Sequence, residues 1–268
     1  NVAIGSFALD ATQSADFNTA VGYQAGTAIT SGGGNVFMGY AAGASKTENG
    51  DSIFIGYRAG HGCTTGADII FIGKNAGDGH DTEANNLGIG TNALGGSIAG
   101  GEFNVMIGNN AGDAITSGDS NTGVGYNTQT NITTGANNTS LGDDAMNDID
   151  TGSGNVNIGD GTGNGANTNH SIVIGQAAQG KGSNTGFISP NGGAVYQGNN
   201  SSSWSTTSDR RIKKNIEDNN IGLEKINKIR VRNFEYRLPE EITEVPTHAA
   251  IKKEGVQVGA IAQEIQEV

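Results

Sequence analysis

A short repeated motif decides the fold: residues 19–26 read TAVGYQAG, residues 36–43 read VFMGYAAG and residues 53–60 read IFIGYRAG. In each copy an apolar residue precedes a glycine, and a small residue follows the glycine three positions later. The glycine recurs at positions 5, 22, 39, 56, 73, 90, 108, 125, 142, 159 and 175, so the spacing is 17 residues with single exceptions of 18 and 16. A fixed period of this kind is typical of a solenoid, in which each repeat is one unit stacked on the next.

Each copy also has an apolar or β-branched residue two positions before the one that precedes the glycine, such as Val36 before Met38. A spacing of two is the strand period, so both side chains face the same way. We expect one short strand per repeat, a turn at the glycine, and then a tightly packed inward Ala or Thr. The intervening segments are rich in Gly, Ser, Thr, Asn and Asp, which form turns because they tolerate positive φ. The predicted fold class is mainly β, a parallel β-roll or β-helix rod of about eleven 17-residue coils over residues 1–180.

An asparagine precedes the strand in most repeats, and two interpretations of it are open. The side chains form a ladder from coil to coil, or each one caps its own turn. The positions are Asn18, Asn35, Asn86, Asn104, Asn121, Asn138 and Asn155.

A single coil of this composition offers only three or four inward apolar groups. Ordering the 17 residues of a repeat costs more conformational entropy than that burial offsets, and stacked backbone hydrogen bonds recover only part of the difference. We therefore expect further burial against other chains, in a homotrimer with a shared apolar axis.

Composition changes near residue 208. Residues 1–207 contain four Lys or Arg and 16 Asp or Glu, a net charge of −12, whereas residues 208–268 contain 11 of each; 42 of the 45 glycines precede Ser208. An acidic, glycine-rich rod is not expected to bind nucleic acid, because the phosphates would repel it. The longest apolar run is a few residues, so no membrane insertion is expected. Cys63 is the only cysteine, which excludes an intrachain disulfide, and the ends suggest a fragment of a longer polypeptide.

The period is lost after residue 180. Residues 181–207 are expected to be a connector with short strands near 187–190 and 194–196, in which the only tryptophan, Trp204, packs at a trimer junction. Residues 208–216 then read SDRRIKKNI, and residues 221–229 read IGLEKINKI, with the apolar spacing of a short amphipathic helix. Residues 230–237 alternate as a strand, and residues 258–265, VGAIAQEI, predict a strand that continues into a helix.

Two resemblances follow from these motifs. The repeat Asn-x-x-[Ile/Val]-Gly-x-x-Ala resembles the head repeats of trimeric autotransporter adhesins, which are trimeric β-rolls, and similar repeats occur in fibre proteins of tailed phages. Residues 208–268 resemble an incomplete copy of the C-terminal intramolecular chaperone domain of endosialidases and other phage tail spikes and fibres. That resemblance implies a chaperone that assists trimer folding of the preceding fibre.

The same resemblance implies self-cleavage between Ser208 and Asp209. Ser208 would be the nucleophile, Lys213 its base partner and Asp209 the new N-terminus. A serine hydroxyl needs a nearby base, and a lysine serves as one when burial lowers its pKa. The alternative is that Ser208 is a helix N-cap and Lys213 a solvated charge. Any enzyme activity would then be at most this single-turnover, serine-type autoproteolysis.

No metal or cofactor is expected. The histidines (His61, His80, His170 and His248) form no ligand pattern, and the acids of residues 78–81 and 143–144 are expected to be solvated turn residues rather than calcium ligands. A polysaccharide-cleaving site would need paired carboxylates, whose pairing across coils the sequence does not define.

The leading functional hypothesis is a structural, receptor-binding segment of a phage tail fibre or tail spike. It would be made in the host cytoplasm, reside in the virion, and contact a host cell-surface polysaccharide or protein receptor and other tail proteins. The alternatives are a polysaccharide-degrading tail spike enzyme and a bacterial trimeric surface adhesin.

Overall fold

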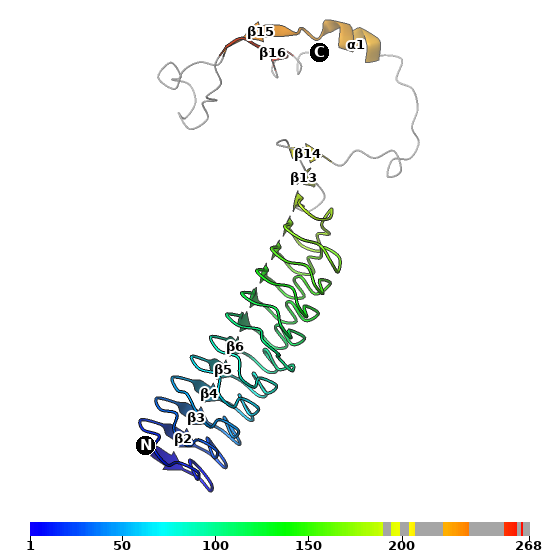
Figure 1. Ribbon diagram of the computed structural model, residues 1–268. Helices are drawn as coiled ribbons and strands as arrows, with labels where there is room; N and C mark the ends of the chain where they lie inside the picture. Colours follow the sequence, from blue (N-terminus) through cyan, green and yellow to red (C-terminus); the bar gives the residue numbers. More distant parts are fainter. Residues whose placement is uncertain (190–193, 199–203, 207–221, 236–254, 262–263, 265–268) are drawn as a thin grey trace. The chain divides into compact units, whose positions relative to one another are not determined.

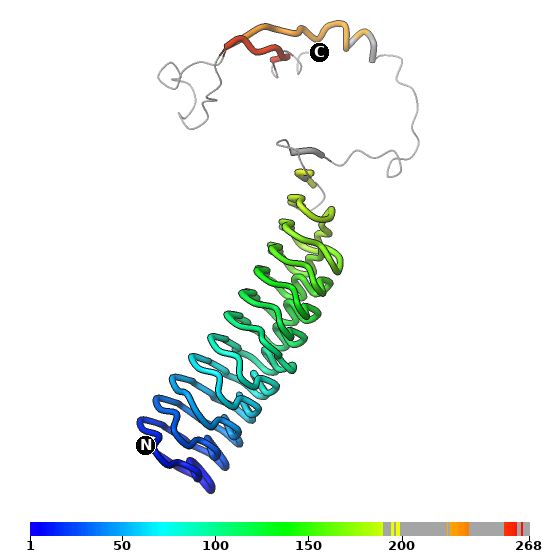
Figure 2. The backbone as a smooth tube through the Cα atoms, in the orientation of Figure 1, coloured from blue at the N-terminus to red at the C-terminus, as the bar shows by residue number. Residues whose placement is uncertain are grey.

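The computed structural model describes residues 1–189, 194–198, 204–206, 222–235, 255–261 and 264. The chain divides into two compact units, Asn1–Thr207 and Ser208–Val268. The first unit is a rod of stacked coils (Figures 1 and 2).

Each coil of the rod contributes one three-residue strand, and successive strands pair in parallel in sequence order. Partners in the ladder are 17 residues apart for most coils, as in Ile53 opposite Ile70. The prediction of a mainly β rod of about eleven parallel coils is therefore confirmed. The strands are β1 (Val2–Ile4), β2 (Thr19–Val21), β3 (Val36–Met38), β4 (Ile53–Ile55), β5 (Ile70–Ile72), β6 (Leu87–Ile89), β7 (Val105–Ile107), β8 (Thr122–Val124), β9 (Thr139–Leu141), β10 (Val156–Ile158) and β11 (Ile172–Ile174).

The sheet changes direction at its C-terminal end. Strand β12 (Gly186–Ile188) still pairs in parallel with β11, but β13 (Val195–Gln197) and β14 (Trp204–Thr206) pair antiparallel. The predicted short strands of the connector therefore form and end the ladder of coils.

The middle residue of each strand from β2 to β11 points into the coil and is buried. Phe37, Phe54 and Phe71 are completely buried, and their ring centroids lie 5.7 and 5.5 Å apart from coil to coil. The small residue after the turn is buried as predicted, as Ala42 and Ala59 show. The first and third residues of each strand do share a face, as their spacing predicts, but it is the outer one.

The turn after each strand requires glycine. Gly39 and Gly56 have φ angles of 136° and 140°, where other residues are strained. A Cβ on Gly39 would lie 2.3 Å from the carbonyl oxygen of Gly56 in the next coil. The recurring glycine therefore allows backbone to pack directly on backbone.

The asparagines before the strands form a ladder between coils. Asn35 donates from its backbone N–H and from Nδ2 to Oδ1 of Asn18, at 2.9 and 3.0 Å. Asn18 in turn donates from Nδ2 to the Gly32 carbonyl of the next coil, at 2.8 Å. Of the two interpretations, the ladder is confirmed, and it is interrupted where Ser52 and Ile69 take the place of asparagine.

The second unit contributes one described helix and one hairpin. Helix α1 (Gly222–Lys228) lies within the predicted amphipathic segment. Strands β15 (Arg232–Phe234) and β16 (Gln257–Gly259) pair antiparallel. Both strands fall where the sequence predicts strands.

We expect Asn121→Ala to weaken the rod by about 2–4 kcal/mol of unfolding free energy. The change removes the acceptor of the Asn138 N–H at 3.0 Å and the donor to Gly135 at 2.8 Å, both buried. Urea unfolding followed by circular dichroism measures the loss. The matched control is Asn131→Ala, whose side chain is exposed and whose one hydrogen bond, to the Asn147 carbonyl, is open to water, so we expect a change within about 0.5 kcal/mol. Equal effects of the two substitutions would contradict a stabilising ladder.

Candidate functional site

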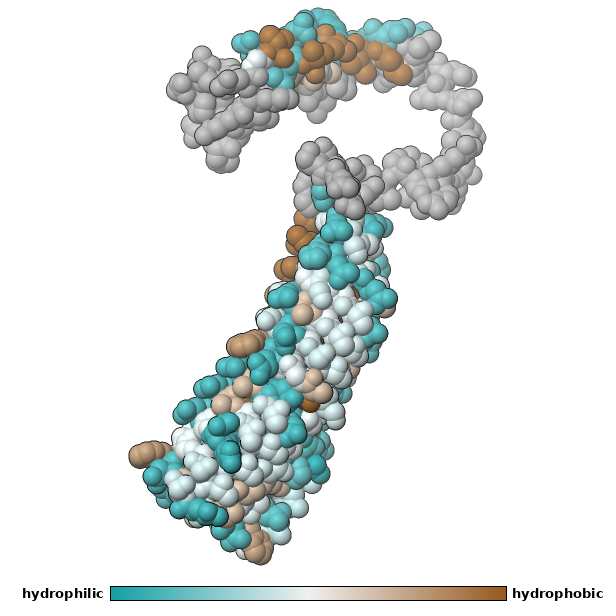
Figure 3. Space-filling model, in the orientation of Figure 1, coloured by the Kyte–Doolittle hydropathy of each residue, from teal (hydrophilic) through white to brown (hydrophobic). Residues whose placement is uncertain are grey.

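The first candidate interaction surface is the face formed by the first and third residues of β1–β11, here called the outer strand face. These residues are mostly Val, Ile, Leu and Met, and in the single chain they are half-buried or exposed. Among the most exposed are Met38, Leu141 and Ile172. In Figure 3 the hydrophobic side chains visible on the edge where Figure 1 shows the strand arrows gather near the C-terminal end of the rod, with isolated ones closer to its N-terminus. Such a long apolar surface is uncommon on a monomer and indicates a binding surface.

An aromatic column borders this face in the first four coils. The rings of Tyr23, Tyr40 and Tyr57 stack at 5.4 and 5.0 Å with interplanar angles of 14° and 10°, and Phe7 meets Tyr23 edge-on at 5.8 Å. The rings remain about half exposed. Our sequence interpretation missed this column, although the 17-residue spacing of the three tyrosines signals it.

A second asparagine ladder, also missed, continues near this column in the middle coils. The Nδ2 of Asn75 donates to Oδ1 of Asn92 at 3.3 Å, and the pattern repeats from Asn92 to Asn110 and from Asn110 to Asn127 at 3.1 and 3.0 Å. These side chains sit at positive φ, which asparagine tolerates better than most residues.

One segment of the rod interior carries titratable side chains in three successive coils. At the interior position that is Ile29, Ile115, Ile132 and Ile149 in other coils, three successive coils carry Lys46, Cys63 and His80, all buried. Lys46 donates from Nζ to the Gly66 carbonyl. Burial lowers the pKa of Lys46 and raises the pKa of the Cys63 thiol, so the thiol is protonated and unreactive at neutral pH.

His80 is the most perturbed of these groups. Its ring lies 4.5 Å from the ring of Phe71, and burial lowers its pKa from 6.5 to about 4, opposed by the charge of Glu83. Glu83 is itself held by the backbone N–H groups of Asp81, Thr82 and Gly100 at 3.0–3.1 Å. His80 is therefore neutral at physiological pH and serves as packing.

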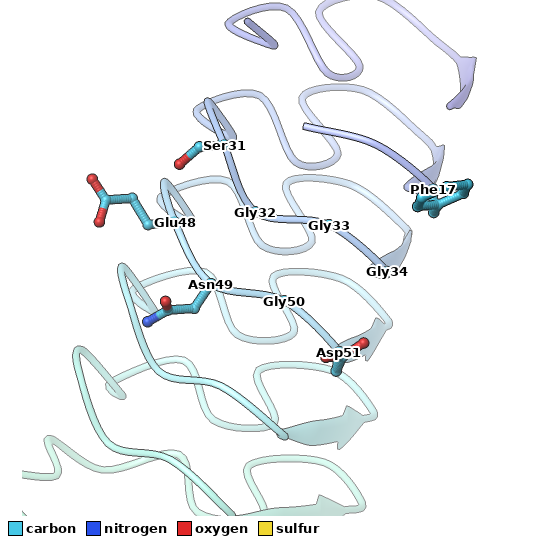
Figure 4. A pocket seen from close by; sticks show the side chains of 9 residues that line it. All are labelled: Phe17, Ser31, Gly32, Gly33, Gly34, Glu48, Asn49, Gly50 and Asp51. Carbon is cyan, nitrogen blue, oxygen red and sulfur yellow. The ribbon is translucent and has the colours of Figure 1, made fainter. Parts of the chain in front are cut away.

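An open groove of about 520 Å³ crosses the turns of two coils (Figure 4). Its floor is the bare backbone of Gly32, Gly33, Gly34 and Gly50, so the groove exists because these turns lack side chains. Figure 4 shows Glu48 and Asp51 at opposite ends of this floor. The groove thus does not present the facing pair of carboxyl groups that glycoside hydrolysis requires.

The predicted cleavage residues Ser208, Asp209 and Lys213 lie outside the described residues. Within the described part of the C-terminal unit, Arg232 on β15 pairs with Glu264, from Nη2 to Oε1 at 2.8 Å and from Nε to Oε2 at 3.2 Å. This bidentate pair lowers the pKa of the Glu264 carboxyl. It joins two segments in which the sequence predicts strands, residues 230–237 and residues 258–265.

The described residues contain no group of three or more His, Cys, Asp or Glu arranged to hold a metal ion. Of the acids considered for calcium, Asp78 instead forms an ion pair with Arg58 at 3.2 Å. No helix within the described ranges has the length and apolar character needed to cross a bilayer.

One family model matches the C-terminal part of the chain. Residues 208–268 match the family model described as chaperone of endosialidase. No curated protein and no solved structure matches the chain significantly. Residues 208–268 are thus similar to a chaperone domain, whereas none of the matches covers the rod.

His80 gives the rod a specific acid sensitivity. Because its folded pKa of about 4 is below its ordinary value of 6.5, the unfolded chain binds the proton first, and stability is lost as pH falls from 6.5 to 4. The loss attributable to this group is about 3 kcal/mol. We expect His80→Ile to remove that part of the pH dependence in urea unfolding at a series of pH values. If the difference in unfolding free energy between wild type and variant stays constant between these pH values, the assignment to His80 is wrong.

Proposed function

We propose that the chain is a segment of a homotrimeric phage tail fibre or tail spike, in which residues 1–180 form the shaft and residues 208–268 act as an intramolecular chaperone. The observation that carries the proposal is a rod of stacked coils followed directly along the chain by a segment that matches the chaperone of endosialidase. Because the strands of the rod are nearly alike, each could pair with several others during folding. A chaperone in the same chain would favour the correct pairing.

The outer strand face supports association into a trimer. It runs along β1–β11 and is apolar, while the rest of the rod is acidic and polar. Three parallel rods around one axis would bury this face on every protomer at once, because closed rotational symmetry presents the same surface of each chain to the axis.

Exposed apolar side chains in the C-terminal unit support a role in assembly. Ile226 on α1, Val231 before β15 and Val258 on β16 are 63, 70 and 71% exposed in the single chain. A small unit with such side chains gains stability by association, since burial of apolar surface is the dominant favourable term.

In the proposed self-cleavage, water is consumed and the peptide bond between Ser208 and Asp209 is broken. Ser208 acquires a carboxylate and Asp209 a free amine. Ser208 Oγ would attack the carbonyl carbon of the Ser208–Asp209 bond while neutral Lys213 accepts the hydroxyl proton, and Lys213 then delivers this proton to the Asp209 amine as the C–N bond breaks. Water hydrolyses the resulting strained lactone, which restores the Ser208 hydroxyl and leaves its carboxylate. The reaction would release the chaperone once the shaft has assembled.

We favour a structural, receptor-binding shaft over a polysaccharide-degrading spike. The two carboxyl groups of the turn groove lie at its opposite ends, so the groove offers a binding surface and not an acid–base pair. The shaft would reside in the virion after synthesis in the host cytoplasm, and the receptor would be a polysaccharide or protein of the host cell surface.

The trimer predicts a mass of three times 27.2 kDa for the uncleaved chain in light scattering. Ile72→Glu places a charge on the outer strand face, where it stays partly hydrated in a single rod but becomes buried at the axis. We expect this variant to be monomeric with an unchanged β circular dichroism spectrum. Thr134→Glu, at an exposed turn without positive φ, is the matched control and should remain trimeric. A wild-type protein at 27.2 kDa would refute the trimer.

Self-cleavage predicts a fragment that begins at Asp209 in denaturing mass spectrometry of the wild-type protein. Ser208→Ala removes the nucleophile and Lys213→Ala its base, so both variants should remain intact, with at least a hundredfold slower cleavage. If wild type and variants all stay intact while the protein is trimeric, residues 208–268 are a permanent part of the fibre and the proteolytic proposal is wrong.

A further inference from the structure

Two columns of side chains flank the outer strand face. The leading column consists of the residue two positions before each strand, such as Asp68 before β5. The trailing column consists of the residue after each turn glycine, such as Lys74 after Gly73. In β5 the whole strand and its turn separate the two along the chain. Asp68 and Lys74 form no ion pair with each other in the described structure.

Lys74 is an unusual charge in this rod. Residues 1–180 contain three cationic side chains of Lys or Arg: Lys46, Arg58 and Lys74. Lys46 is buried, and Arg58 is paired with Asp78. Lys74 is exposed, and within the described part of the chain no carboxylate lies within 4.0 Å of its amine. It thus projects from an acidic rod without an ion-pair partner among the described residues.

The complementary charges lie on the opposite flank. The leading column carries exposed carboxylates at Asp68, in the coil of Lys74, and at Asp51, in the preceding coil. If parallel rods share an axis through their outer strand faces, rotation brings the trailing column of one protomer against the leading column of the next. Rotational symmetry adds no shift along the axis, so equal coils face each other. Lys74 then meets Asp68 of the neighbouring protomer.

The remaining coils are compatible with the same register. In the coil of β2, the trailing Tyr23 would face the leading Phe17, whose ring is 86% exposed. The trailing acids Asp143 and Asp160 lie in coils whose leading residues are Asn137 and Gly154. No described coil of the rod therefore places an acid opposite an acid.

We propose that the trailing column of each protomer docks on the leading column of the next protomer in register, with Lys74 paired to Asp68 across each of the three interfaces. This inference rests on the proposed trimer and adds the contact that sets its register and parallel orientation. An antiparallel pair of rods would bring like columns together and would separate these charges.

Cysteine cross-linking tests the register directly. The double variant Asp68→Cys/Lys74→Cys, oxidised in the native state, should migrate as a covalent trimer on a non-reducing denaturing gel. Each single variant should migrate as a monomer. The buried native Cys63 is present in all three proteins, so the single variants control for it. A covalent dimer as the end product would instead show two-fold association and overturn the proposal.

Charge exchange tests the pairing itself. Lys74→Glu should raise the dissociation concentration of the trimer about tenfold, because three interfaces each lose an ion pair and gain a repulsion. Asp68→Lys combined with Lys74→Glu should restore it, and failure of this rescue would overturn the pairing. A wild-type protein that is trimeric but does not cross-link refutes only the register, whereas a monomeric wild type refutes the proposed trimer as well.

Discussion

The rod depends on direct contact between the backbones of neighbouring coils at the turn after each strand. The carbonyl oxygen of Gly56 occupies the space that a Cβ on Gly39 would need, and the same contact recurs along the rod. Because the coils can approach so closely only at these glycines, the strands pair in register, the phenylalanines stack inside, and asparagine side chains reach the next coil. The close stacking also leaves room inside the coil for only the middle residue of each strand. The first and third strand residues therefore form the outer strand face.

Most of the fold could be predicted from the sequence because it is periodic. The glycine spacing gave the number of coils, and the spacing of two between Val36 and Met38 gave the strands. It could not give the side on which those residues lie, since a three-residue strand with Phe54 between Ile53 and Ile55 is apolar on both faces. The volume inside the coil decides which side chains are buried, and it accommodates one side chain of each strand.

The functional residues were less predictable for a different reason. The 17-residue repeat determines the architecture of the rod. Functional information therefore lies in the residues that depart from the repeat, and their effect depends on contacts between coils. The tyrosine column and the second asparagine ladder become visible only when residues 17 or 18 apart are placed side by side. Ser208, Asp209 and Lys213 were expected from a motif alone, and their geometry lies outside the described residues.

The polar interior of the coils that carry Lys46, Cys63 and His80 has a consequence for how a repetitive chain finds one structure. Where successive repeats are nearly identical, a strand that pairs one coil too early or too late loses little energy, and the chain has many almost equivalent alignments. A lysine, a thiol and an imidazole in consecutive coils make such shifted alignments unequal, because each group would meet the wrong neighbours. These three residues distinguish the coils that carry them from their neighbours, and they do so at positions where isoleucine would provide more stability.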